Sequence, residues 1–459
     1  MIRQANSFRH PESNSAWQRV CGYASSHPHY PAKPLPGPID NFVPNSVTMI
    51  SKARNRARAR RIITLSAILL IAIASASLAA GQSERMRAQQ LGINAGMLPS
   101  GPLNMITDVP GVKVGHATRI EGEHIRTGVT AILPHGGNIF RQKVPGAIYN
   151  FNSFGKMAGS LQVDELGNIE SPIVLTNTLS VGTAVEATAA WVLAQEGNED
   201  VRSVNALVGE TNDGHLNDIR GQHVTAEDVF RAIESAAPGV VDEGSVGAGT
   251  GTRSFGYKSG IGTASRVTAP IGGQQYTVGV LVQSNFGRDL YINGVPFTRE
   301  MDRMQRQGRM QQQEDPMKGS RLEEDDGSAM IIIATDAPLS DRNLRRMAKR
   351  SFMGMGRTVG YMSNFSGDFA IAYSTAYTIP PGGMRLVDPA PALIGNNEMN
   401  PLFQAVEEAA QEAIYNALFM SEGMSGRDGN RMEAIPLDKV IEILDRYGMR
   451  HLNDRFSQE

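Results

Sequence analysis

Gly327-Ser328-Ala329-Met330-Ile331-Ile332-Ile333-Ala334-Thr335-Asp336-Ala337-Pro338-Leu339 is the stretch that decides the fold of this chain. A short apolar run that ends at Asp and Pro is typical of a buried strand. The acidic run Glu323-Glu324-Asp325-Asp326 comes directly before it, so the chain turns from polar to apolar at the Gly327-Ser328 junction. Ser328 is therefore predicted to begin a strand, at the mouth of a sheet.

Two interpretations of Ser328 are open. It is either a serine in a hairpin turn, or the new N-terminus of a chain that is cut just before it. A cut would give Ser328 a free α-amine, whose unperturbed pKa is about 7.7–8.0. Nucleophile and base would then belong to one residue, as in N-terminal nucleophile catalysis.

Charge divides the chain in two. Residues 1–79 carry ten Lys or Arg against Glu12 and Asp40, a net +8, so the whole-chain charge of −2 leaves about −10 for residues 80–459. An acidic body without a basic stripe argues against nucleic acid as a partner. The length of 459 residues could hold two to three average domains, and a hydrophobic content of 41% is ample for a globular core.

The N-terminal region has the order of an export signal. A basic block at 52–61 precedes an apolar run from Ile62 to Ala76, and small residues follow at 77 and 79–81. Met49 is a natural start for this signal. We therefore expect residues 49–80 to be a signal peptide and residues 1–48 to come from an overlong gene start. We expect a periplasmic or secreted protein. The alternative is an uncleaved membrane anchor, although the run is shorter than the roughly 20 residues that a spanning helix needs.

The remaining chain has few groups for thiol or metal chemistry. The only cysteine, Cys21, lies in the segment expected to be absent, which excludes a cysteine nucleophile. The histidines beyond residue 80 show no metal-type spacing, so no metal and no organic cofactor is expected. No Gly-x-Ser-x-Gly elbow is present either.

Strand-like and helix-like segments alternate from about Gly101 onward. Strands are predicted at 112–116, 127–133, 173–176, 204–208 and 276–283, and helices at 184–195, 225–236, 341–355, 402–422 and from Pro436 to Gly448. Short connections between them predict a layered α/β body rather than separate domains. Residues 299–326 show no apolar period and are expected to form a mobile loop that leads to Ser328.

Polar residues end or precede several of these strands. Ser366 and Asp368 precede an alternating strand, Asn285 ends an apolar one, and Glu210 follows another. Each is compatible with an ordinary turn or strand end. A hydroxyl beside a carboxylate can also bind an amine, an Asn amide can stabilise an oxyanion, and Glu can bind an ammonium group.

The Gly-rich run 244–262 has no Gly-Lys-Ser/Thr and no following helix, which argues against a phosphate loop. We expect close backbone packing around a site instead.

Together these segments resemble the DmpA-type family of L-aminopeptidase/D-esterases and β-peptidyl aminopeptidases. The likeness covers most of residues 88–450. Its motifs, which occur in the family's order, are Gly101-Pro102-Leu103-Asn104, Ile106-Thr107-Asp108-Val109-Pro110-Gly111-Val112, Arg126-Thr127-Gly128-Val129-Thr130-Ala131, Gly209-Glu210-Thr211-Asn212-Asp213-Gly214, the Gly-rich run and Ala334-Thr335-Asp336-Ala337-Pro338-Leu339.

The resemblance implies a four-layer αββα sandwich, similar to the N-terminal nucleophile hydrolases. It implies self-cleavage between Gly327 and Ser328, which gives an α-chain (81–327, with a mobile tail at 299–327) and a β-chain (328–459). Asp368 stands where some relatives have Glu, and His215 stands where relatives carry a bulky aromatic residue.

The resemblance also implies a role for each site residue. Ser328 matches the nucleophile, Asn285 the oxyanion-stabilising residue, and Ser366 and Asp368 the pair beside the amine. Glu210 and Tyr149 match residues that line the substrate's amino-group pocket.

The predicted function is an exported, self-cleaving serine aminopeptidase for small peptides, amino-acid amides or esters. The family implies a homo-oligomer of αβ units, and substrates with α-L, D or β residues all stay open. The alternatives are an acyltransferase of the same fold, which would cleave itself at threonine, and a non-catalytic periplasmic binding or scaffold protein.

Overall fold

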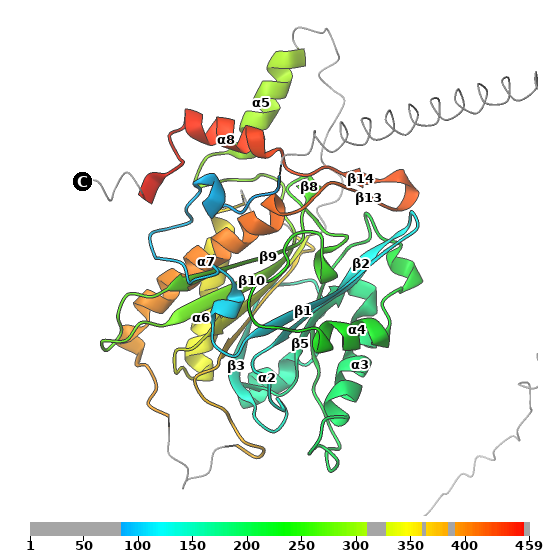
Figure 1. Ribbon diagram of the computed structural model, residues 1–459, viewed down its shortest axis with the longest axis vertical. Helices are drawn as coiled ribbons and strands as arrows, with labels where there is room; N and C mark the ends of the chain where they lie inside the picture. Colours follow the sequence, from blue (N-terminus) through cyan, green and yellow to red (C-terminus); the bar gives the residue numbers. More distant parts are fainter. Residues whose placement is uncertain (1–83, 310–326, 360–363, 384–390, 454–459) are drawn as a thin grey trace, which may run out of the picture. The chain divides into compact units, whose positions relative to one another are not determined.

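Two stacked β-sheets form the centre of this computed structural model (Figure 1), which describes residues 84–309, 327–359, 364–383 and 391–453. One sheet has the order β1-β2-β5-β6, and the other has the order β4-β3-β12-β11-β10-β9. Within the second sheet β11 and β12 run parallel, whereas the other neighbours are antiparallel. The expected segments 1–48 and 49–80 lie outside the described residues.

The strands of the first sheet are β1 (Lys113–Glu121), β2 (Ile125–Leu133), β5 (Ile173–Asn177) and β6 (Leu207–Thr211). Those of the second are β3 (Val144–Ser153), β4 (Asn168–Ile169), β9 (Ile261–Val267), β10 (Thr277–Asn285), β11 (Ser328–Thr335) and β12 (Gly367–Ser374). Two short hairpins are added by β7 (Arg253–Ser254) with β8 (Tyr257–Lys258), and by β13 (Met424–Ser425) with β14 (Arg431–Met432).

The α-helices are α2 (Ser160–Leu166), α3 (Val181–Leu193), α4 (Ala226–Glu234), α5 (Phe297–Arg309), α6 (Asp341–Gly356), α7 (Asn400–Phe419) and α8 (Leu437–Arg446). Short 3₁₀ helices occur at Gln89–Leu91, Ile106–Asp108, Thr178–Ser180, Ile219–Gly221, Gly247–Gly249, Asn396–Glu398 and Arg427–Gly429. None of the helices in the described ranges is long and apolar enough to cross a membrane.

Helices cover the outer face of each sheet, which gives an α-β-β-α order of layers. Helices α6 and α7 pack on the six-stranded sheet, and α3 and α4 pack on the four-stranded sheet (Figure 1). Strand β11 shows how the sequence builds these layers, because every one of its residues is buried. Met330 and Ile332 point into the core between the sheets, whereas Ile331 and Ile333 point to the helices.

Local signals in the sequence set several element boundaries. Thr225 is the N-cap of α4, and its side chain and that of Asp228 form a capping box. Pro401 stands in the first turn of α7, where its missing N–H leaves no hydrogen bond unmade.

Several predicted bounds differ from the observed ones, and two of the differences have a clear physical reason. Residues 297–309 form helix α5 rather than the start of a mobile tail, because Phe297, Met301 and Met304 recur at helical spacing and pack on the core. Residues 310–326 lie outside the described residues. Strand β6 begins at Leu207 instead of residue 204, because its ladder with β5 begins with the pair Ile173 and Leu207.

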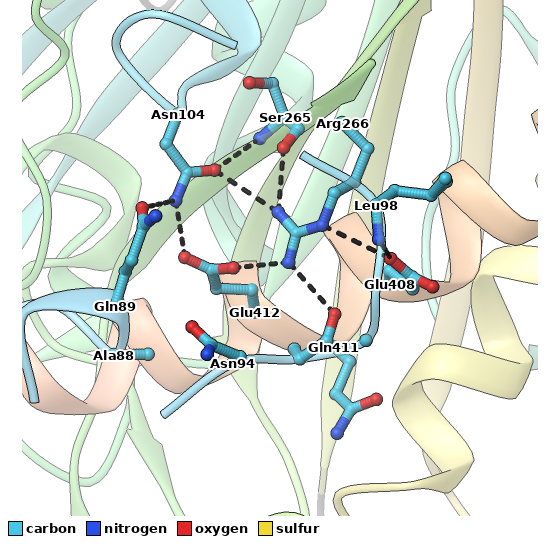
Figure 2. Close-up of polar contacts among 12 residues, drawn as sticks. Ala88, Gln89, Asn94, Leu98, Asn104, Ser265, Arg266, Glu408, Gln411 and Glu412 are labelled. Carbon is cyan, nitrogen blue, oxygen red and sulfur yellow. Dashed lines mark hydrogen bonds and ion pairs between the residues drawn. The ribbon is translucent and has the colours of Figure 1, made fainter. Parts of the chain in front are cut away.

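A buried ion network fastens the N-terminal segment to α7 (Figure 2). The Arg266 guanidinium pairs with Glu412 and with Glu408, where Nε and Oε2 are 3.5 Å apart. It also donates to the backbone carbonyl of Ala95 at 3.0 Å, and the Leu98 N–H donates to Glu408 at 2.9 Å. Residues before β1 are therefore tied to the last long helix.

Candidate active site

Three strand ends meet at the Gly327-Ser328 junction. Asn285 is the last residue of β10 and lies opposite Ser328, the first residue of β11, in an antiparallel ladder. Gly367, the first residue of β12, lies opposite Ser328 on the other side in a parallel ladder. Residues that are 43 and 39 positions from Ser328 in the sequence are thus its direct neighbours.

The Ser328 hydroxyl lies against the peptide bond that precedes it. Its Oγ donates to the Gly327 carbonyl oxygen at 2.7 Å, and the Gly367 N–H donates to the same oxygen at 3.1 Å. Ser328 is only 6% exposed. The Gly327 carbonyl, which would be attacked during self-cleavage, therefore has the Ser328 hydroxyl beside it and the Gly367 N–H hydrogen-bonded to its oxygen.

Gly327 allows the chain to pass close to its neighbours. A Cβ at this position would lie 3.2 Å from the Phe286 Cα and 3.4 Å from the Ser366 Oγ. The first distance is tighter than a side chain tolerates easily, which accounts for a glycine here. The Ser366 hydroxyl therefore lies beside the junction.

Ser366 and Asp368 form a buried pair. The Ser366 hydroxyl donates to Asp368 Oδ1 at 2.9 Å, and Asp368 is 0% exposed. Asp368 Oδ2 is buried and has no hydrogen-bond partner among the described residues. Desolvation raises the pKa of Asp368 to about 6, against the opposing effects of the Ser366 hydroxyl and the Ala329 N–H.

The side chain of Asn285 is held in one orientation. Asn285 is 4% exposed, and its Oδ1 accepts the Arg253 N–H at 3.1 Å. The amide NH₂ therefore points away from Arg253 and can donate to another acceptor, which an oxyanion requires.

The Gly-rich run positions this Arg253 N–H by close backbone packing. A Cβ on Gly260 would lie 1.7 Å from the Gly244 carbonyl oxygen, so no other residue fits. Lys258 is fully buried and donates from Nζ to the backbone carbonyls of Gly249, at 3.1 Å, and Ser259. Burial lowers the pKa of Lys258 to about 7. The sequence analysis missed this lysine, since an isolated Lys among glycines carries no signal of burial.

Glu210 is the penultimate residue of β6 and a buried carboxylate with donors on both oxygens. It is 2% exposed; Oε2 accepts the Thr178 hydroxyl, and Oε1 accepts the Lys156 N–H at 3.0 Å. The Lys156 ammonium lies 3.9 Å from Oε1. Burial raises the pKa of Glu210, against the effects of Thr178 and Lys156.

The carboxylate belongs to the same neighbourhood as the serine. A Cβ on Gly155 would lie 3.2 Å from Glu210 Oε1 and 3.1 Å from the Gly367 Cα. Sequence reasoning missed Thr178 and Lys156, as well as Asn177, whose Oδ1 accepts the N–H groups of Leu179 and Ser180.

Tyr149 is not brought to this cluster. Its ring lies on the helix-covered face of β3, 6.0 Å from the Phe352 ring, and the Lys349 Nζ lies 5.9 Å from the Tyr149 ring centroid. The neighbouring Ile148 points into the core between the sheets, because successive strand residues alternate. The ring contacts of Tyr149 are thus with residues of helix α6.

Comparison with known proteins agrees with this architecture. The model of peptidase family S58 matches residues 104–432. The chain belongs to this family. As an S58 peptidase it is an aminopeptidase and a hydrolase, and the fold class predicted from the sequence is confirmed.

Two relatives are β-peptidyl aminopeptidases. The chain is 38% identical over 385 residues to BapA of Sphingosinicella microcystinivorans, which covers 80% of this chain and 94% of that protein. It is also 38% identical over 396 residues to BapA of Sphingosinicella xenopeptidilytica, covering 83% and 96%.

Solved structures share the fold. The PH0078 protein from Pyrococcus horikoshii OT3 is 46% identical, with a TM-score of 0.71 over 79% of this chain and 100% of that chain. The L-aminopeptidase D-Ala-esterase/amidase from Ochrobactrum anthropi is 35% identical, with a TM-score of 0.70 over 79% and 99%. The latter is described as a prototype of the serine aminopeptidases and a new variant of the Ntn hydrolase fold.

Proposed function

We propose that this aminopeptidase cuts its own chain between Gly327 and Ser328 and then uses Ser328 as an N-terminal nucleophile on peptides. The observation that carries the proposal is the contact of Ser328 Oγ with the Gly327 carbonyl oxygen at 2.7 Å. The Gly367 N–H on the same oxygen would stabilise negative charge that develops there.

The cut begins when Ser328 Oγ attacks the Gly327 carbonyl carbon. A C–O bond forms, the C–N bond breaks, and the hydroxyl proton moves to the departing nitrogen. Water then splits the ester, which leaves a carboxylate on Gly327 and a free amine and hydroxyl on Ser328.

The same hydroxyl next attacks the carbonyl of a substrate's N-terminal residue. The Ser328 amine takes the hydroxyl proton and returns it to the leaving amine. Asn285 donates to the oxyanion, which for such a donor is worth roughly 10²–10³ in rate. Water releases the acyl group. Ser366 and Asp368 hold the protons of the Ser328 amine.

Glu210 would bind the substrate's ammonium group. This buried carboxylate already has the Lys156 ammonium at 3.9 Å, which supports a site for a cation. A substrate amine paired with Glu210 places the following carbonyl toward Ser328, which limits cleavage to N-terminal residues.

The test is the substitution Ser328→Ala. The wild-type protein should give two bands on a denaturing gel, with the β-chain beginning Ser-Ala-Met-Ile on Edman sequencing. S328A should remain one band and hydrolyse no aminoacyl p-nitroanilide. Ser374→Ala, at a buried serine at the far end of β12, should be cut and active. An S328A chain that is still cut, or that still turns over substrate, would refute the proposal.

We also propose export and assembly into oligomers of αβ units. The basic, apolar and small-residue order of residues 52–81 supports the export signal. Fractionation of an expressing bacterium, with N-terminal sequencing of the α-chain, tests export. Light scattering tests the assembly into oligomers.

A further inference from the structure

Two phenylalanine rings lie exposed beside the candidate site. Phe154 is 59% exposed and Phe365 is 55% exposed, and their ring centroids are 5.2 Å apart in an edge-to-face arrangement. These residues are far apart in the sequence, so the tertiary structure alone makes them a pair.

The pair is attached to both halves of the site. The Phe154 N–H donates to the Ser366 carbonyl at 3.2 Å, and Phe365 directly precedes Ser366. Two residues after Phe154, the Lys156 N–H donates to Glu210 at 3.0 Å. The two rings therefore lie between the Glu210 carboxylate and the Ser366–Asp368 pair beside Ser328.

Phe365 also has an unfavourable backbone. Its φ of 61° lies in the left-handed region, which is uncommon for a bulky residue. Such strain persists where the surrounding structure imposes it, and it clusters at functional sites. Burial does little to offset the strain here, because Phe365 is more than half exposed.

We infer that Phe154 and Phe365 form the wall of the subsite that takes the side chain of the substrate's N-terminal residue, and that this subsite selects apolar side chains. The inference rests on the proposed function. An N-terminal residue bound to Glu210 by its amine and to Ser328 by its carbonyl carries its side chain between these two groups, where the rings lie. The Lys156 ammonium, 6.0 Å from the Phe154 ring centroid, would repel a basic side chain.

The experiment compares kcat/KM for the p-nitroanilides of leucine, phenylalanine, alanine and lysine. Wild type should prefer leucine or phenylalanine over alanine and lysine. Phe154→Ala and Phe365→Asn should lower kcat/KM for the large apolar substrates by roughly 10–100-fold and leave alanine within about threefold. Asn is chosen at 365 because it tolerates a positive φ.

Phe151→Ala is the matched control. Phe151 is also exposed, at 46%, but its ring stacks on Phe352 on the far side of β3, so its loss should leave the substrate preference unchanged. Self-cleavage of each variant reports that it has folded.

Three outcomes would overturn the inference alone: a wild type that prefers alanine or lysine, an equal loss on all substrates, or a changed oligomeric mass with unchanged selectivity. A wild type that stays uncut and hydrolyses none of the four substrates would refute the proposed function, and the inference with it.

Discussion

The fold buries the carboxyl group of Asp368, and burial disfavours its charged form. It is fully buried, one oxygen has no partner among the described residues, and burial raises its pKa from 3.8 to about 6. Between these two values the folded state binds more protons than the unfolded chain, so the contribution of Asp368 to stability falls as the pH rises. Above about pH 6 Asp368 is charged in both the folded and the unfolded state, and the folded protein bears the full free-energy cost of burying this charge. At 1.36 kcal/mol per pH unit, this cost is up to about 3 kcal/mol.

We therefore expect Asp368→Asn to stabilise the protein while it damages catalysis. At pH 8 the free energy of unfolding should rise by up to about 3 kcal/mol, and at pH 4 the difference should nearly vanish. The measurement is urea unfolding of S328A and S328A/D368N, since both are expected to stay uncut. In the active background kcat should fall roughly 10²-fold, because a neutral amide cannot hold the proton of the Ser328 amine. A D368N chain that is less stable at pH 8 would contradict this account.

Helix α5 shows how one buried side chain can fix a helix with a polar surface. Glu300 is 7% exposed and accepts the Tyr447 hydroxyl at 3.0 Å and the Arg446 guanidinium at 3.3 Å, both from the end of α8. Together with Phe297 and Met301 it holds α5 on the body of the protein.

Glu300→Ala should loosen α5 without unfolding the rest. Charge-assisted hydrogen bonds of this kind contribute about 1.5–3 kcal/mol, so amide protection in α5 should fall by at least tenfold. Hydrogen exchange followed by mass spectrometry measures this. Gln305→Ala, at an exposed position on the same helix, should change the protection little. Equal exchange in both variants would show that the apolar contacts alone hold α5.

The network around Arg266 acts at the scale of the whole molecule, because it joins the segment before β1, strand β9 and helix α7 (Figure 2). The side chains of Arg266, Glu408 and Glu412 are only 4%, 5% and 3% exposed. Removal of the guanidinium would leave two carboxylates buried side by side.

Arg266→Met should lower the free energy of unfolding by about 3–5 kcal/mol. The further change Glu412→Gln should restore part of the loss, since it removes one of the uncompensated charges. Arg357→Met breaks the Arg357–Glu407 pair on the solvent side of α7, whose side chains are 47% and 21% exposed, and should cost less than about 1 kcal/mol. Urea titrations of the three variants give the comparison, and equal losses in R266M and R357M would refute the role assigned to the network.

The amino-acid sequence by itself determined the features that depend on local pattern. The apolar run after Ser328 predicted a buried strand that begins at that residue, which is confirmed. A helix was predicted from residue 225, and α4 begins directly after the Thr225 N-cap. The order of several motifs also sufficed for the family and the α-β-β-α class.

Only the tertiary structure decided which residues meet. The ladders place Asn285 and Gly367 beside Ser328, and a strand's own sequence does not state its neighbours or their register. Tyr149 lies on the face of β3 that the helices cover, which the sequence of the strand does not reveal. Residues of α5, which were expected to be mobile, are helical and pack against α8. Buried charge behaves in the same way: Lys258 and Asp368 have shifted pKa values because of what surrounds them in space, which neighbours in the sequence do not specify.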